Sequence, residues 1–239
     1  VRSTDELGQL AGRFNRMVER LRAHLDESVR RRQELSDAQI RMMQAQLNPH
    51  FLYNTLDTVK WMGKINQVPE VATVAADLAD ILRSSISGDE FVTLEQELLT
   101  LRRYVEIQSI RFPGKFTLET DVDEAAMDVL VPKLMLQPIV ENSIIHGFAD
   151  SGGRIEVRAR MSGEELEVTV QDDGCGMSEE SLRRFREPGT DEKRHHLGLR
   201  NVDAILRLHY GEDHGLRFPP ADGRGTCVEI SLPARFEEG

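Results

Sequence analysis

The sequence predicts a chain of class α plus α/β, in which a long helical region precedes a domain of mixed helices and strands. Apolar residues recur at helical spacing over about the first 60 residues. Short alternating segments of the strand type begin only at Phe116. Charged residues make up 30% and aromatic residues 5% of the 239 residues, a mix that suits long exposed helices in a chain large enough for two modest cores.

The N-terminal part is predicted to form one helix over residues 5 to about 60. Its apolar seam recurs at alternating three- and four-residue steps, through Leu7, Leu10, Phe14, Met17, Leu21 and Leu25. So narrow a stripe is typical of a helix that pairs with a second copy, and we expect a homodimer; the alternative is an amphipathic helix within a bundle of one chain. Pro49 removes a helical hydrogen bond and is expected to kink the helix just before His50.

Two further helices are expected before the strands begin. A break from Gly63 to Pro69 precedes a helix over about 69–87, which would complete a helical hairpin. Two such hairpins would form a four-helix bundle in the dimer. The segment TLEQ at 93–96 has the form of a capping box and should open a third helix that ends near Pro113.

The C-terminal domain is expected to begin near residue 114. Its alternating segments predict strands over 116–122, 154–161, 165–171 and 226–232. Helices are predicted between them, over about 131–146 and 199–209. Strands interleaved with helices indicate a second domain of mixed type.

The bulk composition argues against several classes of protein. A formal net charge of −11 argues against nucleic-acid binding, which needs a basic face. Cys175 and Cys227 have no metal-binding spacing and are expected to be reduced thiols. No apolar run reaches the roughly 20 residues of a membrane helix. The chain begins within a helical pattern, so we expect it to be cut from a longer protein, with any transmembrane sensor before Val1.

Four short clusters in the C-terminal domain are candidates for a nucleotide site, although the sequence has no GxxxxGK[ST] phosphate loop. Glu141 and Asn142 interrupt an apolar helix, where polar side chains are costly unless they are used. The segment DDGCG at 172–176 follows a strand, and its glycines would let the backbone approach a flat ring. Gly198 opens a helix, whose free amides favour phosphate. The segment GRGT at 223–226 precedes the last strand.

In this order and spacing, the clusters resemble the ATP-binding domain of GHKL (Bergerat) type that histidine kinases, gyrase-type ATPases and heat-shock chaperones share. The resemblance covers about residues 115–235 and implies an α/β sandwich that binds ATP and Mg²⁺ under a lid at about 178–197. It implies that Asn142 coordinates Mg²⁺, that Asp172 accepts a hydrogen bond from the adenine amine, and that Glu141 positions or activates a reactant. The other residues that it places around the nucleotide are His146, Gly174, Gly176, Gly198, Leu199, Gly225 and Thr226, of which Thr226 supports Asp172.

Two positions depart from the pattern of that domain. The lid motif usually begins with a glycine where this chain has His196, and relatives often carry a phosphate-contacting lysine where this chain has Ile145. His146 would partly substitute for the lysine, and a buried structural histidine is the alternative.

The most specific segment, QAQLNPHFLYNTL at 44–56, is similar, nearly residue for residue, to the phosphoacceptor box of the YesM/LytS-like sensor histidine kinases. The segments YVEIQ at 104–108 and RF at 111–112 match the same family, and the start of the chain resembles the second half of a HAMP signalling module. The resemblance implies three parts: HAMP-like residues 1–25, dimerisation and phosphotransfer helices over 26–113, and a catalytic domain over 114–239.

The same resemblance implies a protein-histidine kinase at the cytoplasmic side of the cell membrane. His50 would take the γ-phosphate of ATP, because a neutral imidazole is nucleophilic at pH 7, and would pass it to an aspartate in the receiver domain of a response regulator. Asn54 shares the helix face of His50 and would hold a water or the imidazole. Two alternatives stay open: a GHKL-type ATPase that drives a clamp, and a non-catalytic dimeric signalling scaffold with a decayed ATP site.

Overall fold

The computed structural model describes residues 49–86, 89–148, 152–186, 197–220 and 224–236. The chain divides into two compact units, residues 1–52 and 53–239. Apart from the start of the first helix, the elements below belong to the second unit. The predicted N-terminal seam, the HAMP-like start and His196 lie outside the described residues.

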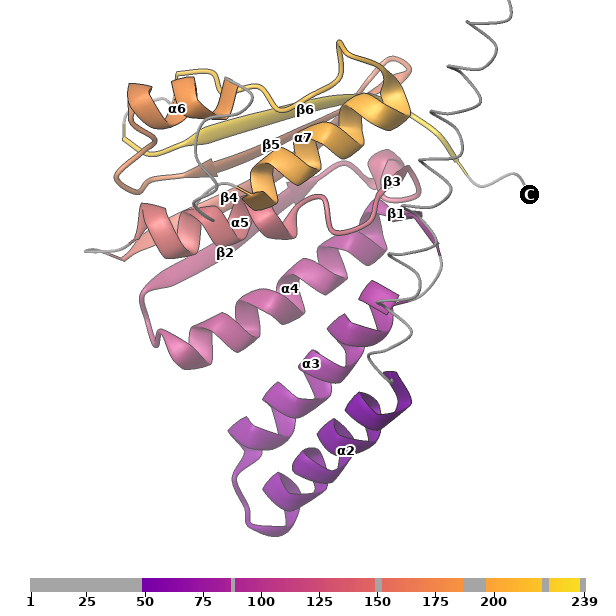
Figure 1. Cartoon of the computed structure of the whole chain (residues 1–239), viewed down its shortest axis with the longest axis vertical. Coiled ribbons are helices and arrows are strands. Elements are labelled where there is room, and N and C mark those ends of the chain that lie inside the picture. Colours follow the sequence, from indigo (N-terminus) through magenta and orange to yellow (C-terminus); the bar gives the residue numbers. More distant parts are fainter. Residues whose placement is uncertain (1–48, 87–88, 149–151, 187–196, 221–223, 237–239) are drawn as a thin grey trace, which may run out of the picture. The chain divides into compact units, whose positions relative to one another are not determined.

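Two helices form a hairpin at the start of the described chain (Figure 1). Helix α2 spans Pro49–Ile65 and helix α3 spans Pro69–Ile86. The predicted break is confirmed, but it begins after Ile65, because Gly63 lies inside α2 and is the only buried residue among 51–65. A Cβ at Gly63 would lie 2.8 Å from the backbone nitrogen of Ala72, so the missing side chain lets the two helices approach closely.

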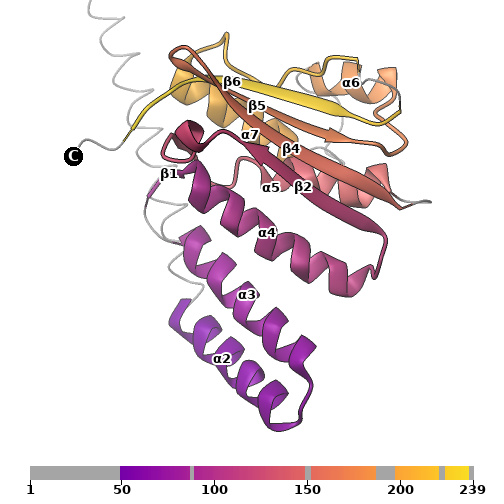
Figure 2. The same ribbon diagram turned by 180° about the vertical axis from the view of Figure 1, so that it is seen from behind.

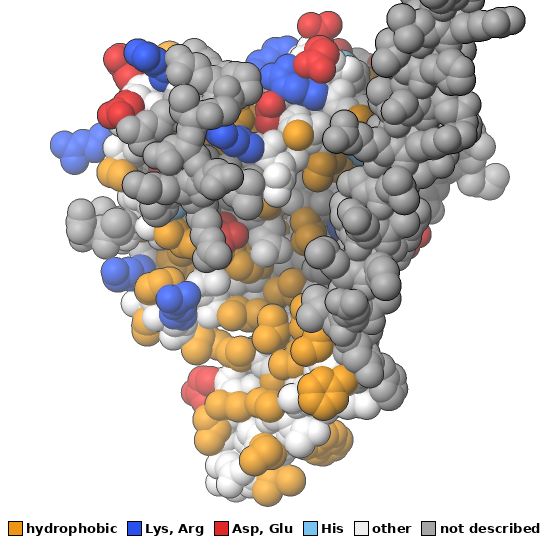
Figure 3. All heavy atoms as spheres, in the orientation of Figure 1, with side chains coloured by type: hydrophobic (Ala, Val, Ile, Leu, Met, Phe, Trp, Pro, Cys, Tyr) orange, Lys and Arg blue, Asp and Glu red, His pale blue; other side chains and the backbone are white. Residues whose placement is uncertain are grey.

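The hairpin exposes a large set of apolar side chains. Figure 3 shows hydrophobic atoms gathered over the part of the molecule that α2 and α3 form. We call this set the hairpin apolar surface; it consists of Val59, Trp61, Met62, Ile65, Val68, Val71 and Leu78. The side chains that α3 buries are small, Ala72, Ala75 and Ala79. The hairpin therefore buries little apolar area within one chain.

The predicted capping box opens the third helix, α4 (Leu94–Arg111), as expected. The hydroxyl of Thr93 accepts a hydrogen bond from the backbone N–H of Gln96 at 3.3 Å. The helix ends two residues before Pro113, which cannot continue it. Arg103 of α4 contacts Asp80 of α3 at 3.2 Å, so α4 lies between the hairpin and the sheet (Figure 1).

Each of the four predicted strands is present, and together they form one sheet in the order β2-β4-β5-β6. The strands are β2 (Phe116–Val122), β4 (Gly153–Ser162), β5 (Glu165–Asp172) and β6 (Cys227–Pro233). The β2–β4 pair is parallel and the other two pairs are antiparallel. Helices α4, α5 (Gln137–Asn142) and α7 (Leu197–Tyr210) cover one face of the sheet (Figures 1 and 2). The predicted α/β sandwich is confirmed.

The alternation of buried and exposed side chains along β5 places Asp172 on the face of the sheet that the helices cover. Leu166, Val168 and Val170 are buried, whereas Glu165 before them and Glu167 among them are exposed. Successive side chains of a strand point to opposite faces, so Asp172 continues the buried series. Its carboxylate is therefore carried into the layer between the sheet and the helices.

The predicted helix over 131–146 is wrong in its first part. Residues Leu130–Pro132 form strand β3, which pairs antiparallel with an unpredicted strand β1 (Phe91–Thr93). Leu134 has a positive φ of 58°, a conformation that a helix cannot contain. Helix α5 begins only at Gln137, and a π-helical segment, Ser143–Gly147, continues it. Short elements also occur at Glu124–Ala126 and at Glu179–Arg186 (α6). None of the helices in the described residues has the length and apolar character to cross a membrane.

Candidate active site

Asp172 is the centre of the candidate nucleotide site. Its carboxylate is 2% exposed and is held by three donors. One oxygen, Oδ1, accepts from the backbone N–H of Gly174 at 3.0 Å and of Thr226 at 3.1 Å. The other, Oδ2, accepts from the hydroxyl of Ser143 at 2.7 Å. A carboxylate offers about four lone-pair sites, so Oδ2 keeps the capacity to accept one more hydrogen bond.

Close backbone packing surrounds this carboxylate. A Cβ at Gly174 would lie 2.5 Å from the carbonyl oxygen of Gly147, and a Cβ at Gly225 would lie 1.8 Å from the carbonyl oxygen of Asp172. Gly225 also has a φ of +107°, and Gly176 a φ of +79°, which other residues rarely adopt. A Cβ at Gly147 would lie 3.3 Å from Oδ1 of Asp172. Side chains at Gly174 and Gly225 would therefore collide with neighbouring backbone, and a side chain at Gly147 would press on the carboxylate itself.

Thr226, directly before strand β6, contacts Asp172 through its backbone. Its backbone N–H donates to the carboxylate, and its carbonyl accepts from the backbone N–H of Asp172 at 2.9 Å. Thr226 is itself buried. Thr226 therefore holds Asp172 through two backbone contacts, and its role in nucleotide binding stays a prediction.

Asn142 lies at the junction of two helical forms. Helix α5 ends at Asn142, and the π-helical segment begins at Ser143, which bonds to Asp172. Such wide turns are frequent at functional sites. Glu141 and Asn142 are both half-buried, so their polar groups lie at the edge of the core. His146 is exposed, which contradicts the alternative of a buried structural histidine.

The start of α7 lies beside the start of α5. A Cβ at Gly198 would lie 3.2 Å from the Cβ of Pro138, so a larger residue would crowd this contact. The side chain of Leu199 is 2% exposed and belongs to the hydrophobic core. Gly198 and Leu199 were both expected at this site. Because the side chain of Leu199 is buried, only its backbone could contact a ligand.

The hydroxyl of Tyr104 on α4 is close enough to Glu141 on α5 to be affected by its charge. Burial raises the pKa of the Tyr104 hydroxyl, and the negative charge of Glu141 raises it further. The side chain of Gln108 bonds to this hydroxyl, and the positive charge of Arg111 acts on it in the opposite direction. Tyr104, Gln108 and Arg111 of the YVEIQ and RF segments thus act on one hydroxyl group, together with Glu141.

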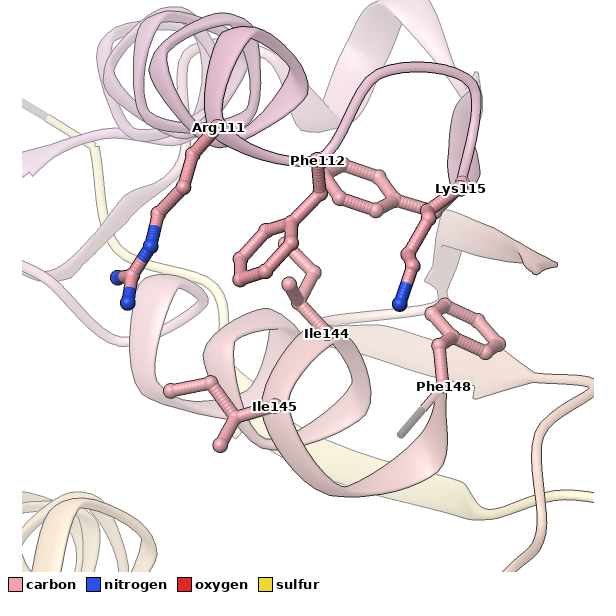
Figure 4. Close-up of a pocket in the computed structure, with 7 residues that line it drawn as sticks. Arg111, Phe112, Lys115, Ile144, Ile145 and Phe148 are labelled. Atoms are coloured by element: carbon pink, nitrogen blue, oxygen red, sulfur yellow. The ribbon is translucent and has the colours of Figure 1, made fainter. Parts of the chain in front are cut away.

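A pocket of about 240 Å³ lies between the end of α4 and the π-helical segment (Figure 4). Arg111 extends toward its Ile145 end and Lys115 toward its Phe148 end. Both cations also lie over the ring of Phe112, at 5.0 Å and 5.8 Å from its centroid. Ile145 is 49% exposed. Two positive charges therefore border the helix edge where the expected lysine is replaced by Ile145.

The donor set is suited to a Mg²⁺ ion that is shared with a nucleotide. Across the described segments, no group of three or more His, Cys, Asp or Glu side chains could hold a metal ion. Asn142 offers a single amide oxygen, and Mg²⁺ commonly combines one or two protein oxygens with waters and substrate phosphates.

Other expected site residues lie partly outside what the structure describes. The side chain of His50 and residues 187–196 of the predicted lid are among them, and the described start of the lid forms α6. Asn54 is exposed on α2, and its carbonyl accepts from the hydroxyl of Thr58 at 2.8 Å. Two further residues contact or face the Asp172 carboxylate and were not predicted as site residues, Ser143 and Gly147. The position of Ser143 directly after Asn142 was its signal, and no signal in the sequence pointed to Gly147.

Three family models match the chain. They are the HAMP domain over residues 1–23, the histidine kinase model over 38–116, and the histidine kinase-, DNA gyrase B-, and HSP90-like ATPase over 127–235. The last two cover the hairpin with α4 and the domain that contains Asp172. Their order is the order that the sequence analysis expected.

Similar proteins include the sensor histidine kinase YesM of Bacillus subtilis, 32% identical over 98% of this chain, and the sensor histidine kinase/phosphatase LytS of Staphylococcus aureus, 29% identical over 96%. The chain spans 40% and 39% of the lengths of these two proteins. A histidine kinase domain from an Erythrobacter litoralis blue-light activated histidine kinase aligns with a TM-score of 0.47 at 21% identity, over 78% of this chain and 94% of that domain. Three domain models in this order, with relatives similar along almost the whole chain, place it in a single group: the chain belongs to the sensor histidine kinase family.

Proposed function

We propose that this chain is the kinase portion of a membrane-linked sensor, which phosphorylates His50 with Mg-ATP and passes the phosphoryl group to an aspartate of a response regulator. The observation that carries the proposal is the buried Asp172 carboxylate, held by Ser143, Gly174 and Thr226 with one acceptor site to spare. A buried carboxylate is costly unless it is fully used. An exocyclic amine of adenine is a donor that would use that remaining acceptor site.

The phosphates would extend from this base toward Asn142 and the start of α7. A bound Mg²⁺ would neutralise phosphate charge and orient the terminal phosphate. Asn142 would hold it through one amide oxygen. The backbone of Gly198 and Leu199 would offer amides at the first turn of α7, where a helix favours anions. Glu141 would position the reacting groups from the neighbouring side of the same helix.

Arg111 would supply the positive charge that Ile145 lacks. Its side chain extends to the Ile145 end of the pocket, whereas Lys115 extends to the other end (Figure 4). We expect Arg111→Ala to weaken ATP about tenfold and ADP less, because a charge-assisted contact to the terminal phosphate would be lost. Lys115→Ala is the matched control and should change both affinities less than twofold. Equal losses in the two variants would contradict this role for Arg111.

The transfer step requires little covalent chemistry from the protein. A neutral imidazole nitrogen of His50 would attack the γ-phosphorus, the bond to the bridging oxygen would break, and its electron pair would leave with ADP. The resulting phosphohistidine would then transfer the phosphoryl group to a carboxylate oxygen of the regulator's aspartate. Asn54, one turn after His50 on α2, would orient water for removal of phosphate from the regulator. We expect Asn54→Ala to slow that removal more than the kinase step.

The hairpin apolar surface supports the homodimer. Exposed apolar patches of this kind mark interaction sites in soluble domains, and a second hairpin would cover this one in a four-helix bundle. The match to the HAMP model and the sensor names of the relatives support a place at the cytoplasmic side of a membrane. The net charge of −11 offers no support for a nucleic acid partner.

Labelled ATP tests the proposal directly. With Mg²⁺ and γ-labelled ATP, we expect label on the protein that is labile in acid and stable in base, as a phosphoramidate is. His50→Gln should abolish it, whereas His209→Gln, on the far end of α7 beside Phe91, should keep it. Label that persists in His50→Gln would contradict the assignment.

The same assay separates the two alternatives. Release of phosphate with no protein-bound label would indicate a GHKL-type ATPase. Absence of both label and nucleotide binding would indicate a signalling scaffold. The intact set of donors around Asp172 favours the kinase over the scaffold, because a decayed site would have no reason to keep a buried carboxylate.

A further inference from the structure

Glu97 is a buried carboxylate that the proposed reaction does not use. It lies on the first turns of α4 and is 2% exposed. Its two oxygens accept hydrogen bonds from the backbone N–H groups of Leu134 and Leu136, each at 2.9 Å. The N–H of Met135 between them also acts on this carboxylate. Three successive amides of the segment before α5 thus converge on one side chain of another helix.

These amides have no local partner that could replace Glu97. Leu136 is the N-cap residue of α5, and its side chain provides no capping hydrogen bond. Leu134 has a φ of 58°, so the segment is held in a conformation that a leucine rarely adopts. Only the amide of Leu136 belongs to the N-cap residue of α5, and the amides of Leu134 and Met135 belong to the turn before the helix. A carboxylate at the N-terminus of a helix is also favoured by the helix dipole. Glu97 therefore holds the N-cap residue of α5 and the turn that leads into it.

The position of this contact matters because α5 is short. It has 6 residues, Gln137–Asn142, so Asn142 lies less than two turns from the end that Glu97 holds. The other side of Asn142 is fixed through Ser143, which donates to Asp172 at 2.7 Å. The helix that carries Asn142 is thus held at both ends by a carboxylate. Glu97 binds the backbone at its start, and Asp172 binds Ser143 just after its end.

We propose that Glu97 is a positioning residue that sets Asn142 for Mg²⁺ while taking no part in holding the base. The proposal rests on the function proposed above. It follows that substitutions at Glu97 and at Asp172 should affect different parts of the nucleotide affinity. The base would depend on Asp172, and only the part of nucleotide affinity that Mg²⁺ adds would depend on Glu97.

Glu97→Gln tests this separation with a nearly isosteric change. The amide keeps one acceptor oxygen but directs an NH₂ group at one of the two backbone donors, which leaves that donor unsatisfied. ATP affinity is measured by calorimetry with Mg²⁺ and with EDTA, for the whole chain. We expect the gain that Mg²⁺ brings to fall about fivefold in Glu97→Gln, while the affinity in EDTA changes less than about twofold. Glu95→Gln, an exposed position two residues earlier on α4, is the control and should keep the full gain.

The possible outcomes are distinct. If Mg²⁺ still raises the ATP affinity of a folded Glu97→Gln protein by the full factor, the proposal is wrong. It is also wrong if the ATP affinity falls equally with Mg²⁺ and with EDTA, because a merely structural role of Glu97 predicts that result. If Glu97→Gln does not fold, Glu97→Asp keeps the charge and withdraws it by one methylene, and the same two criteria apply. If the unaltered chain binds no ATP, or gains nothing from Mg²⁺, the proposed function fails before Glu97 is tested.

Discussion

The hairpin and the α/β domain bury their apolar residues in opposite ways. The α/β domain buries Leu, Ile, Val, Met and Phe side chains between its sheet and helices within one chain. The hairpin buries one glycine of α2 and three alanines of α3, and it leaves Trp61, Met62 and Ile65 exposed. Ile65 is 76% exposed. The described α/β domain thus buries its large apolar side chains within one chain, whereas the described hairpin leaves several of its own exposed.

This difference separates two properties of the protein. Nucleotide binding should depend on residues of a self-sufficient domain, and association should depend on a hairpin surface that no described element covers. If that separation is correct, variants in one region should leave the property of the other unchanged.

A charge in the hairpin apolar surface should have the largest effect. Trp61→Glu with Ile65→Glu should weaken the dimer about 100-fold, because two carboxylates would have to be desolvated in the interface. Sedimentation equilibrium measures the dissociation constant, and ATP affinity should stay unchanged. Leu208→Glu is the matched control, because Leu208 is 70% exposed but lies on α7 of the α/β domain. Equal weakening by Leu208→Glu would break the comparison.

Asp172→Asn should weaken ATP binding and leave the dimer affinity unchanged. The side-chain oxygen can still accept from Gly174 and Thr226, and Ser143 can rotate to accept from the new NH₂ group, so the fold should persist. The NH₂ group would face the adenine amine, donor against donor, and ATP should bind about 10- to 100-fold more weakly. The preference for ATP over GTP should fall, because guanine has an acceptor at that position. Dimer affinity should not change; a dimer that weakens together with ATP binding would refute the separation.

Gly63→Ala should disturb the hairpin without affecting the site. The added methyl would meet the backbone of Ala72 at 2.8 Å and the carbonyl oxygen of Val68 at 3.2 Å, so α2 would have to move away from α3. Overpacking of this kind costs about 1–3 kcal/mol. Hydrogen exchange should rise in the amides of α2 and stay constant in those of β5. Lys64→Ala, the next and exposed position, should leave both unchanged.

Acid titration should show the smallest effect, with opposite signs in the two regions. Burial raises the pKa of Glu97 above its ordinary value of 4.5. The folded state then binds more protons than the unfolded state, so the stability of the unaltered chain relative to Glu97→Gln should fall as pH rises from 4.5 through the folded pKa. The hydrogen bond from Lys60 lowers the pKa of Asp57 on α2, so the contribution of Asp57 should be present above its ordinary value of 3.8 and be lost as pH falls. Thermal melts of Glu97→Gln and Asp57→Asn across pH measure both slopes, and slopes of the same sign would contradict the assignment.

Local signals in the sequence predicted much of the fold. The capping box at Thr93 and the alternation in β2, β4, β5 and β6 depend on neighbouring residues, and both were recognised. The segment 131–136 was predicted as helix because its apolar residues suit one. Its actual form depends on pairing with β1 and on Glu97, which lies 37 residues before Leu134. No window of local sequence contains these partners.

The residues of the candidate site also fall into those that local sequence predicted and those that depend on tertiary contacts. Asp172 could be found because a polar and glycine-rich segment follows a strand, and Thr226 because it precedes another. The contribution of Ser143 depends on a contact across 29 residues, and the place of Arg111 depends on how α4 lies against the π-helical segment. The exposure of His146 likewise follows from tertiary packing, which its apolar neighbours in sequence did not indicate.

The bond between Thr226 and Asp172 joins residues 54 positions apart and has a consequence for the order of folding. Thr226 directly precedes β6, which is the last described strand of the domain and forms one edge of the sheet. Contacts between distant segments form late, because a long loop must first close. During synthesis the hairpin, with its local contacts, can form early, while the carboxylate of Asp172 stays incompletely held until Thr226 and β6 have emerged. The chain would therefore be able to associate before it is able to bind nucleotide.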